Sequence, residues 1–181
     1  MKATGIVRNI DRLGRVVIPK EVRRTMRINE GDPLEIFTDD GRIIFQKYSV
    51  IGNIGGIAND VLEAMYRSHK MPVIACDKEK VVAARGIPKN EIVNRRLTVE
   101  MEEMMERRQV YAHDEDKGSP CLPVERIERH AVAMAPVIAS GDVVGAIIFL
   151  SPDNIQAATA SQTEVDLAQA FALYLGELLS D

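Results

Sequence analysis

Residues 5 to 27 read GIVRNIDRLGRVVIPKEVRRTMR, and this stretch decides the fold of the first part of the chain. Residues 1–27 contain eight Lys and Arg against two Asp and Glu, a net charge of +6 in a protein whose net charge is −4. Such a concentration of arginine indicates a surface for a polyanion, although a solvated charged face has the same composition. The positions of the arginines have to decide between the two.

Two short apolar runs, 6–10 and 16–18, flank a turn that ends at Gly14. Glycine supplies the positive φ that a tight connection needs. The pattern predicts a β-hairpin with Arg8 in its first strand and Arg15 at the start of its second. Both side chains then project from one small sheet.

A short helix is predicted directly after this hairpin. Pro19 is typical of the first turn of a helix, and the spacing of the following residues predicts an end near Met26. Val22 and Met26 share one face, which we expect to point inward, while Arg23 and Arg24 point outward.

Two further strands are predicted at 34–38 and 42–48, joined by the hairpin signal Asp39-Asp40-Gly41. A domain this short buries little apolar surface and is marginal alone. Its size therefore predicts obligate dimerisation, and a two-fold dimer presents its arginines twice.

The GIVR segment, the LGRVVIPKE segment and the following Arg-Arg pair resemble the DNA-binding domain of AbrB-like transition-state regulators, over residues 1 to about 50. The resemblance implies that two chains exchange hairpins to build one β-barrel that binds double-stranded DNA. It also implies four DNA-contacting arginines: Arg8, Arg15, Arg23 and Arg24. Accessory contacts stay open for Lys2, Arg12 and Arg27. With a second domain of this length behind it, the chain resembles the sporulation regulators of spore-forming bacteria.

The glycine-rich segment 49–56 marks a domain boundary. Residues 1–50 have a net charge of +3 and residues 51–181 a net charge of −7, so we expect the acidic part to stay off DNA. We predict a DNA-binding domain at 1–50, a linker at 51–56 and a second domain at 57–181.

Periodicity predicts the elements of the second domain. They are a helix at 57–68, strands at 72–76 and 81–84, a helix at 91–108 with a break near 97–98, a weak strand at 110–113, a polar loop at 114–129, strands at 130–139 and 143–150, and a final helix that starts with the capping box Ser161 and Glu164. This order resembles a GAF domain, the small-molecule sensor fold, and gives an α+β class for the whole chain. The resemblance implies that helices 57–68 and 161–180 pair between chains, so that a homotetramer forms.

GAF domains often hold a small molecule against the central sheet. This sequence has no glycine-rich phosphate loop, and its three histidines lack metal-ligand spacing, so we predict no cofactor and no metal. The loop that carries Ser119, Pro120 and Cys121 is the predicted lid over a pocket for an unknown effector. An irregular surface loop, and a domain that serves oligomerisation alone, are the alternatives.

We therefore expect a transcriptional regulator, with activation or repression left open, and not an enzyme. A swapped-hairpin antitoxin is one alternative, and a GAF-type thiol enzyme is another. The enzyme needs a reactive thiolate, yet Cys76 lies in a predicted buried strand and Cys121 has no second cysteine nearby. Because the chain has no run of eighteen apolar residues and no secretory signal, we expect a cytoplasmic protein without membrane contact.

Overall fold

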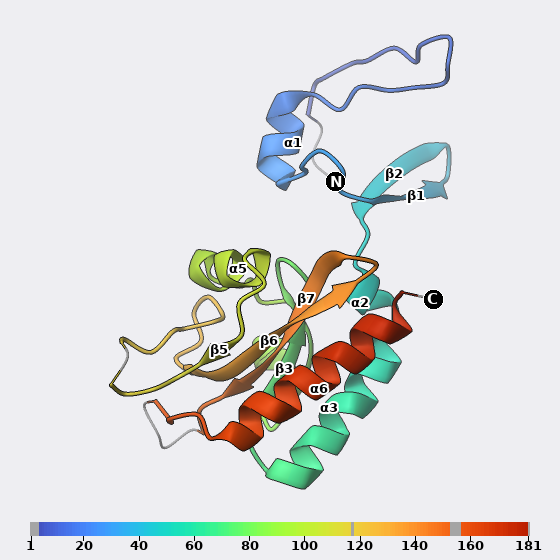
Figure 1. Cartoon of the computed structure of the whole chain (residues 1–181). Helices are drawn as coiled ribbons and strands as arrows, with labels where there is room; N and C mark the ends of the chain where they lie inside the picture. The colour runs from blue at the N-terminus through green and yellow to red at the C-terminus, as the bar shows by residue number, and fades with distance from the viewer. Residues whose placement is uncertain (1–3, 117, 153–156, 181) are drawn as a thin grey trace. The chain divides into compact units, whose positions relative to one another are not determined.

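The computed structural model describes residues 4–116, 118–152 and 157–180 (Figure 1). The chain divides into two compact units, Met1–Tyr48 and Ser49–Asp181, which we call unit 1 and unit 2. Both combine helices and strands, which confirms the predicted α+β class.

Unit 1 contains helix α1 (Lys20–Met26) and a two-stranded antiparallel sheet of β1 (Leu34–Asp39) and β2 (Arg42–Lys47). The strands pair in register from Leu34 opposite Lys47 to Asp39 opposite Arg42. Asp40 and Gly41 both have positive φ, 41° and 74°, as a two-residue hairpin turn requires. The helix and this hairpin lie where the sequence predicts them, but Met26, which was expected to point inward, is 54% exposed.

The first predicted hairpin forms only its turn in the single chain. The amide of Gly14 donates to Asp11 O and the amide of Asp11 donates to Arg15 O, both at 3.0 Å, and Gly14 has φ 76°. The prediction of strands at 6–10 and 16–18 is wrong for one chain, because within the described residues the two arms do not continue this pairing beyond the turn.

No residue between positions 4 and 48 is buried. The apolar side chains of residues 6–17, which we call the turn segment, and of the two-stranded sheet are instead exposed: Ile6, Val7, Ile10, Leu13, Val16, Val17, Ile36, Phe37, Ile43 and Phe45. Val7 is 82% exposed and Leu13 74%. Unit 1 thus exposes the residues that would form a core.

Unit 2 is built on a five-stranded antiparallel sheet with the strand order β4-β3-β7-β6-β5. Its strands are β3 (Val73–Cys76), β4 (Val81–Arg85), β5 (Tyr111–Ala112), β6 (Ala131–Ala139) and β7 (Asp142–Leu150). Each strand lies where the sequence predicts one. The order of helices and strands in unit 2 also confirms the expected GAF-like sequence of elements.

Helices cover both faces of this sheet (Figure 1). Alternate strand residues, such as Ile147 and Phe149, pack with α3 (Gly55–His69) and α6 (Gln162–Leu178). Their neighbours, such as Ile148, pack with α4 (Lys89–Ile92) and α5 (Val99–Glu106). Two covered faces explain why these strands read as continuous apolar runs.

Methionines on α5 contribute to the second of these cores. Met101 and Met105 are buried, as expected for adaptable core residues. The break before α5 is explained by Thr98, whose hydroxyl accepts the amide of Met101 and caps the helix.

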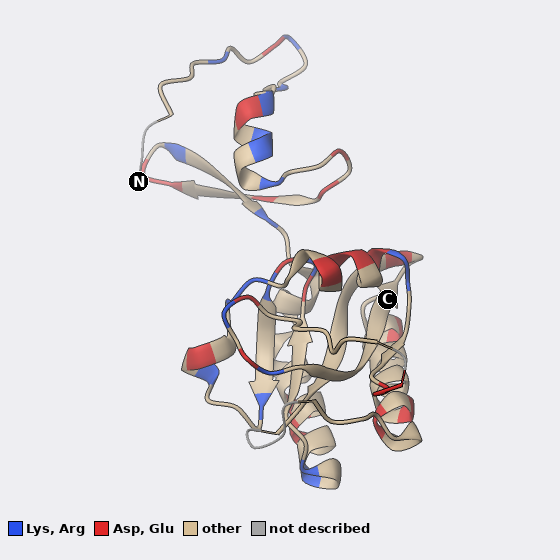
Figure 2. Ribbon diagram, turned by 90° about the vertical axis from the view of Figure 1, so that its left-hand side faces the viewer, with Lys and Arg blue, Asp and Glu red and all other residues tan. Residues whose placement is uncertain are grey.

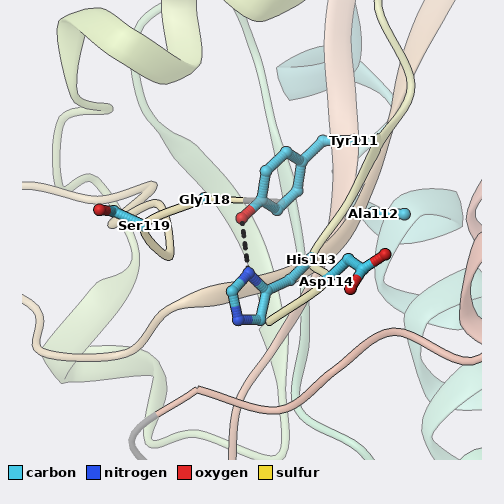
Figure 3. A pocket seen from close by; sticks show the side chains of 6 residues that line it. All are labelled: Tyr111, Ala112, His113, Asp114, Gly118 and Ser119. Carbon is cyan, nitrogen blue, oxygen red and sulfur yellow. Dashed lines mark hydrogen bonds between the residues drawn. The ribbon is translucent and has the colours of Figure 1, made fainter. Parts of the chain in front are cut away.

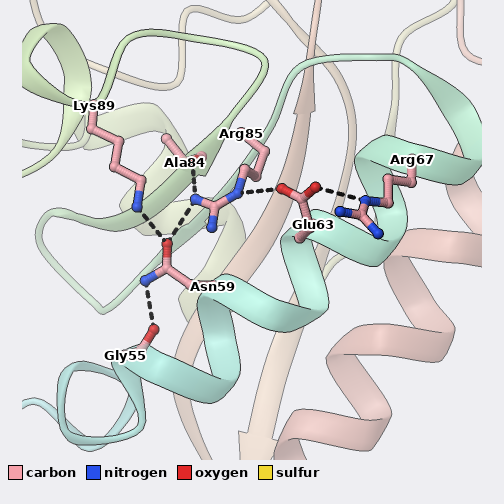
Figure 4. Close-up of polar contacts among 7 residues, drawn as sticks. All are labelled: Gly55, Asn59, Glu63, Arg67, Ala84, Arg85 and Lys89. Carbon is pink, nitrogen blue, oxygen red and sulfur yellow. Dashed lines mark hydrogen bonds and ion pairs between the residues drawn. The ribbon is translucent and has the colours of Figure 1, made fainter.

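A polar network joins α3 to β4 (Figure 4). Arg85 Nε donates to Glu63 Oε2 at 2.8 Å, and Arg67 Nε donates to Glu63 Oε1 at 2.8 Å. Arg85 Nη1 also donates to Asn59 Oδ1, as does Lys89 Nζ. The hydrogen bonds from Arg85 and then Arg67 lower the pKa of Glu63.

The ends of α6 and α3 meet at a buried carboxylate. Ser161 and Glu164 form the predicted capping box of α6, and Glu164 Oε1 lies 2.5 Å from His69 Nε2 at the end of α3.

Among the described residues, no helix is long and apolar enough to cross a membrane.

Unit 2 begins with helix α2 (Val50–Asn53), one residue before α3. The segment 51–56, predicted as a linker, therefore contains helical residues. Ile51 on α2 is completely buried in the core that α3 and α6 form with the sheet.

Candidate nucleic-acid interface

Helix α1 presents two of the four predicted DNA-contacting arginines. Arg23 and Arg24 are neighbours in its last turn and are exposed, and α1 has no buried residue. Positive side chains at a helix C-terminus are favourable because the helix dipole is negative there. Arg27 ends the helix with φ 50°, and its amide donates to Arg24 O at 3.3 Å. Figure 2 shows the Lys and Arg residues of this helix in blue.

The other two predicted arginines lie on either side of the first turn. Arg15 Nε donates to Asp11 Oδ2 at 2.8 Å, while Asp11 Oδ1 accepts the amides of Leu13 and Arg15. These bonds, led by the amide of Arg15, lower the pKa of Asp11, so the carboxylate stays ionised and fixes the turn. Arg8 is exposed and donates to the neighbouring carbonyl of Val7.

Asp11 restricts Arg15 without covering it. The Arg15 side chain remains 71% exposed while it is paired. A guanidinium held at one nitrogen still presents other N–H groups, and its planar fork suits phosphate or guanine. The structure therefore places the four arginines as two pairs: one on α1 and one on the turn segment before it.

A lysine ties α1 to the β1–β2 hairpin. Lys47 Nζ donates to Arg27 O at 2.5 Å and lies 3.3 Å from Asp32 Oδ2. Asp32 Oδ2 also accepts the amide of Asn29 at 2.8 Å, which closes the loop after the helix. Of the accessory residues, Arg12 is exposed and Lys2 lies outside the described residues.

The predicted lid lies beside a small pocket in unit 2 (Figure 3). Ser119 lines it together with Gly118 and residues 111–114, and its volume is about 50 Å³. Pocket volumes for small molecules are usually about 300–1,000 Å³, so this one is too small for a nucleotide or a tetrapyrrole as it stands.

The other two lid residues, Pro120 and Cys121, do not line the pocket. Cys121 is buried, and its amide donates to the hydroxyl of Tyr111 at 3.3 Å. Burial raises the pKa of its thiol to about 12. Burial likewise raises the pKa of Cys76, which is completely buried.

Comparison with known proteins defines the family. The family model described as stage V sporulation protein T C-terminal, transcription factor, matches residues 53–180. The chain belongs to the stage V sporulation protein T family. The family's stage V sporulation protein T from Bacillus subtilis (strain 168) is 42% identical over 155 residues, which cover 85% of this chain and 87% of that protein.

Other relatives match the first unit alone. The transition state regulatory protein AbrB of Bacillus subtilis (strain 168) is 65% identical over 48 residues, 26% of this chain and half of that protein. A solution structure of the N-terminal DNA recognition domain of Bacillus subtilis AbrB is 64% identical and covers 26% of this chain and 91% of that one, with a TM-score of 0.24. The family model for antidote-toxin recognition MazE, a bacterial antitoxin, matches residues 7–50.

Sequence reasoning predicted the four arginines as a DNA-binding set, but it missed the acidic residues that hold Arg15 and Lys47. Asp11 precedes a glycine turn, and an aspartate at such a position often accepts amides two and four residues later, which was a readable signal. The contact of Asp32 with Lys47 joins residues 15 positions apart, and nothing in the local sequence indicates it.

Proposed function

We propose that this protein is a DNA-binding transcriptional regulator of sporulation. Unit 1 reads double-stranded DNA, and unit 2 assembles the oligomer and adjusts its geometry. In this proposal residues 1–50 are the reading domain and residues 57–181 the regulatory domain. The segment 51–56, which includes most of α2, joins them.

The observation that carries the proposal is that Arg8, Arg15, Arg23 and Arg24 are all exposed on a unit with no buried residue between positions 4 and 48. Arginine is suited to bidentate contacts with phosphates and with guanine. Two similarities support the same conclusion. The family is described as a transcription factor, and unit 1 is 65% identical over 48 residues to the transition state regulatory protein AbrB.

The reading form is a dimer of unit 1. The exposed apolar side chains of 6–17 and of the β1–β2 hairpin, with Val7 82% exposed, need a partner surface. Exchange of the open arms between two chains would pair them as strands and close a barrel. The dimer then presents eight arginines to a two-fold related DNA site.

Unit 2 extends the dimer to a tetramer. Leu173 and Tyr174 on α6 are 66% and 52% exposed, and Leu178 and Ile57 are also exposed. Apolar residues on α6 and at the start of α3 suit helix pairing between chains. Tetramerisation would then place two reading dimers in one particle.

The test is binding of the full-length protein to duplex DNA over a salt series. If about half of the eight arginines neutralise phosphates, log K against log salt falls with a slope of about −4, from −0.9 per phosphate. The double variant Arg23→Ala with Arg24→Ala should bind far more weakly and show a flatter slope.

The chain offers a matched control in Arg95→Ala with Arg96→Ala. These are two exposed adjacent arginines in unit 2, and their loss changes the net charge equally. We expect this control to bind DNA like the native protein, with light scattering showing one assembly size for all three. Equal losses in both double variants would contradict a reading site on unit 1.

The antitoxin alternative draws on the match of residues 7–50 to the MazE model. That match lies almost entirely in unit 1, which an antitoxin and a transcriptional regulator of this kind would have in common. Residues 49–181 form a packed domain, whereas toxin-binding tails are typically disordered. The regulator is therefore the better account.

We propose no enzymatic role. A catalytic cysteine works as an accessible thiolate. Burial of Cys76 and Cys121, with the pKa of Cys121 raised to about 12, argues against a thiol enzyme. We further propose that the protein acts in the cytoplasm without a resident cofactor, and that an unknown effector would enter only if the loop with Ser119, Pro120 and Cys121 opens.

A further inference from the structure

The covalent connection between the units is very short. The amide of Tyr48 donates to Pro33 O at 3.0 Å, within unit 1. The next residue, Ser49, already belongs to unit 2, where its carbonyl accepts the amide of Asn53 at 3.1 Å. A single peptide group therefore separates the last backbone hydrogen bond of one unit from the first of the other.

Ser49 is fixed in unit 2 by its side chain. Its hydroxyl accepts the amide of Gly52 at 3.0 Å, which caps α2, and donates to Asp77 Oδ2 at 2.8 Å. Asp77 is 8% exposed, and its other oxygen accepts the amides of Glu79 and Lys80 at 2.9 and 2.8 Å. The carboxylate thus holds the β3–β4 turn with one oxygen and Ser49 with the other.

Close packing keeps α2 beside this carboxylate. A Cβ atom on Gly145 of β7 would lie 2.6 Å from Ile51 Cδ1 and 2.0 Å from Cys76 O. Only glycine leaves room for α2 and β3 to approach β7 here. The start of unit 2 is therefore held both by packing and by the Ser49–Asp77 hydrogen bond.

Backbone and side-chain bonds lead from the β3–β4 turn to the predicted lid loop. The amide of Leu97 donates to Glu79 O at 2.8 Å. One residue later, Thr98 donates to the loop twice, from its amide to Pro123 O at 3.0 Å and from its hydroxyl to Leu122 O at 2.7 Å. Hydrogen bonds thus connect residues 122–123 of the loop to the β3–β4 turn that Asp77 holds.

We propose that the Ser49–Asp77 hydrogen bond, which we call the latch, couples the lid loop of unit 2 to DNA reading by unit 1. The proposal rests on the proposed DNA-binding function and adds its point of control. A closed latch restricts the peptide that joins the units. An open latch lets each reading dimer move more freely, which lowers the effective concentration of the second dimer once the first has bound DNA.

This mechanism predicts a loss that depends on DNA length. The probes are a duplex of about 15 base pairs, which exceeds one helical turn and engages one reading dimer, and a duplex with two such sites in tandem. Full-length Ser49→Ala should bind the short duplex like the native protein. On the two-site duplex its affinity should fall about three- to tenfold, a tenfold change being 1.4 kcal/mol.

Ser49→Thr keeps a hydroxyl and should restore two-site binding. Ser161→Ala is the matched control, because Ser161 also caps a helix and contacts a buried carboxylate, that of Glu164. It should lower the urea midpoint of unfolding about as much as Ser49→Ala and leave the ratio of two-site to one-site affinity unchanged. Light scattering on every variant checks that assembly is the same.

Thr98→Ala tests the route from the loop. It should lower two-site affinity in the native background and add little in the Ser49→Ala background, because both changes act on one path. Full additivity, or no effect of Thr98→Ala alone, would overturn the route.

Three other results would overturn the latch. They are unchanged two-site binding by Ser49→Ala, an equal loss on both duplexes, and no recovery in Ser49→Thr. If the native protein binds neither duplex, the proposed DNA-binding function itself fails, an outcome distinct from the other three.

Discussion

Replacing Gly176 by alanine tests how closely α6 packs on the sheet of unit 2. A Cβ atom there would lie 2.2 Å from Ile138 O and 3.2 Å from Ile138 C. Carbon–oxygen contacts of this kind are normally about 3.3–3.6 Å long, so helix or strand has to move by about 1 Å. The obstacle is the backbone of β6, which pairs with β7 at Ile138, opposite Val143, and so is not free to rotate away.

Two effects oppose each other in this variant. Alanine favours a helix over glycine by about 1 kcal/mol, whereas overpacking costs about 1–3 kcal/mol. Because the clash is with backbone, we take the upper end of that range. The free energy of unfolding should then fall by about 2 kcal/mol, which lowers Tm by about 4–8 °C for a chain of this size.

Gly56→Ala is the control, since Gly56 also lies in a helix but has nothing within 4 Å of a Cβ. Only helix propensity changes there, and stability should rise by up to about 1 kcal/mol. Urea unfolding, followed by circular dichroism at one protein concentration, measures both, because association adds to apparent stability. A Gly176→Ala protein as stable as the native one would refute the packing of α6 on β6.

Three further changes follow from the structure. Burial raises the pKa of Glu164, but hydrogen bonds from Ser161 and His69 outweigh this effect and hold the pKa below 4.5. The stability that this carboxylate contributes is therefore present above pH 4.5 and is lost as the pH falls through the lowered pKa. Urea midpoints should accordingly fall more steeply on acidification in the native protein than in Glu164→Gln. Since burial raises the pKa of Cys121 to about 12, Ellman's reagent should label the folded protein slowly at about pH 8 and the urea-unfolded protein at once. Lys47→Met removes the ammonium that contacts Arg27 O and Asp32, and should cost about 1 kcal/mol, seen as faster amide exchange in α1, while Lys78→Met, an exposed lysine of unit 2, should leave that exchange unchanged.

Local sequence signals predicted most elements of unit 2 because each element is specified within its own stretch. Strands β3 and β6, and β7 after Asp142, consist of apolar residues and glycine, since helices cover both faces of the sheet, and glycine or aspartate marks their turns. The capping box at Ser161 located the start of α6 correctly. The break before α5 was also readable, because Thr98 is a good N-cap.

Contacts between distant residues could not be predicted in this way. Ser49 and Asp77 are 28 residues apart, and His69 and Glu164 are 95 apart. No periodicity links such positions, since only the folded sheet brings them together. The arms of the first hairpin show the opposite case, because their strand-like sequence specifies a pairing that one chain does not complete.

Stability and DNA reading fall to different parts of the chain. Unit 1 carries the arginines and has no buried residue from position 4 to position 48, whereas every residue of the two apolar cores belongs to unit 2. In our proposal, an acidic unit 2 that associates through α3 and α6 keeps the unit 1 copies at high effective concentration, so that hairpin exchange costs less. Unit 1 then needs no apolar core within a single chain, and in this proposal the short connection at Ser49 determines how freely its arginines reach DNA.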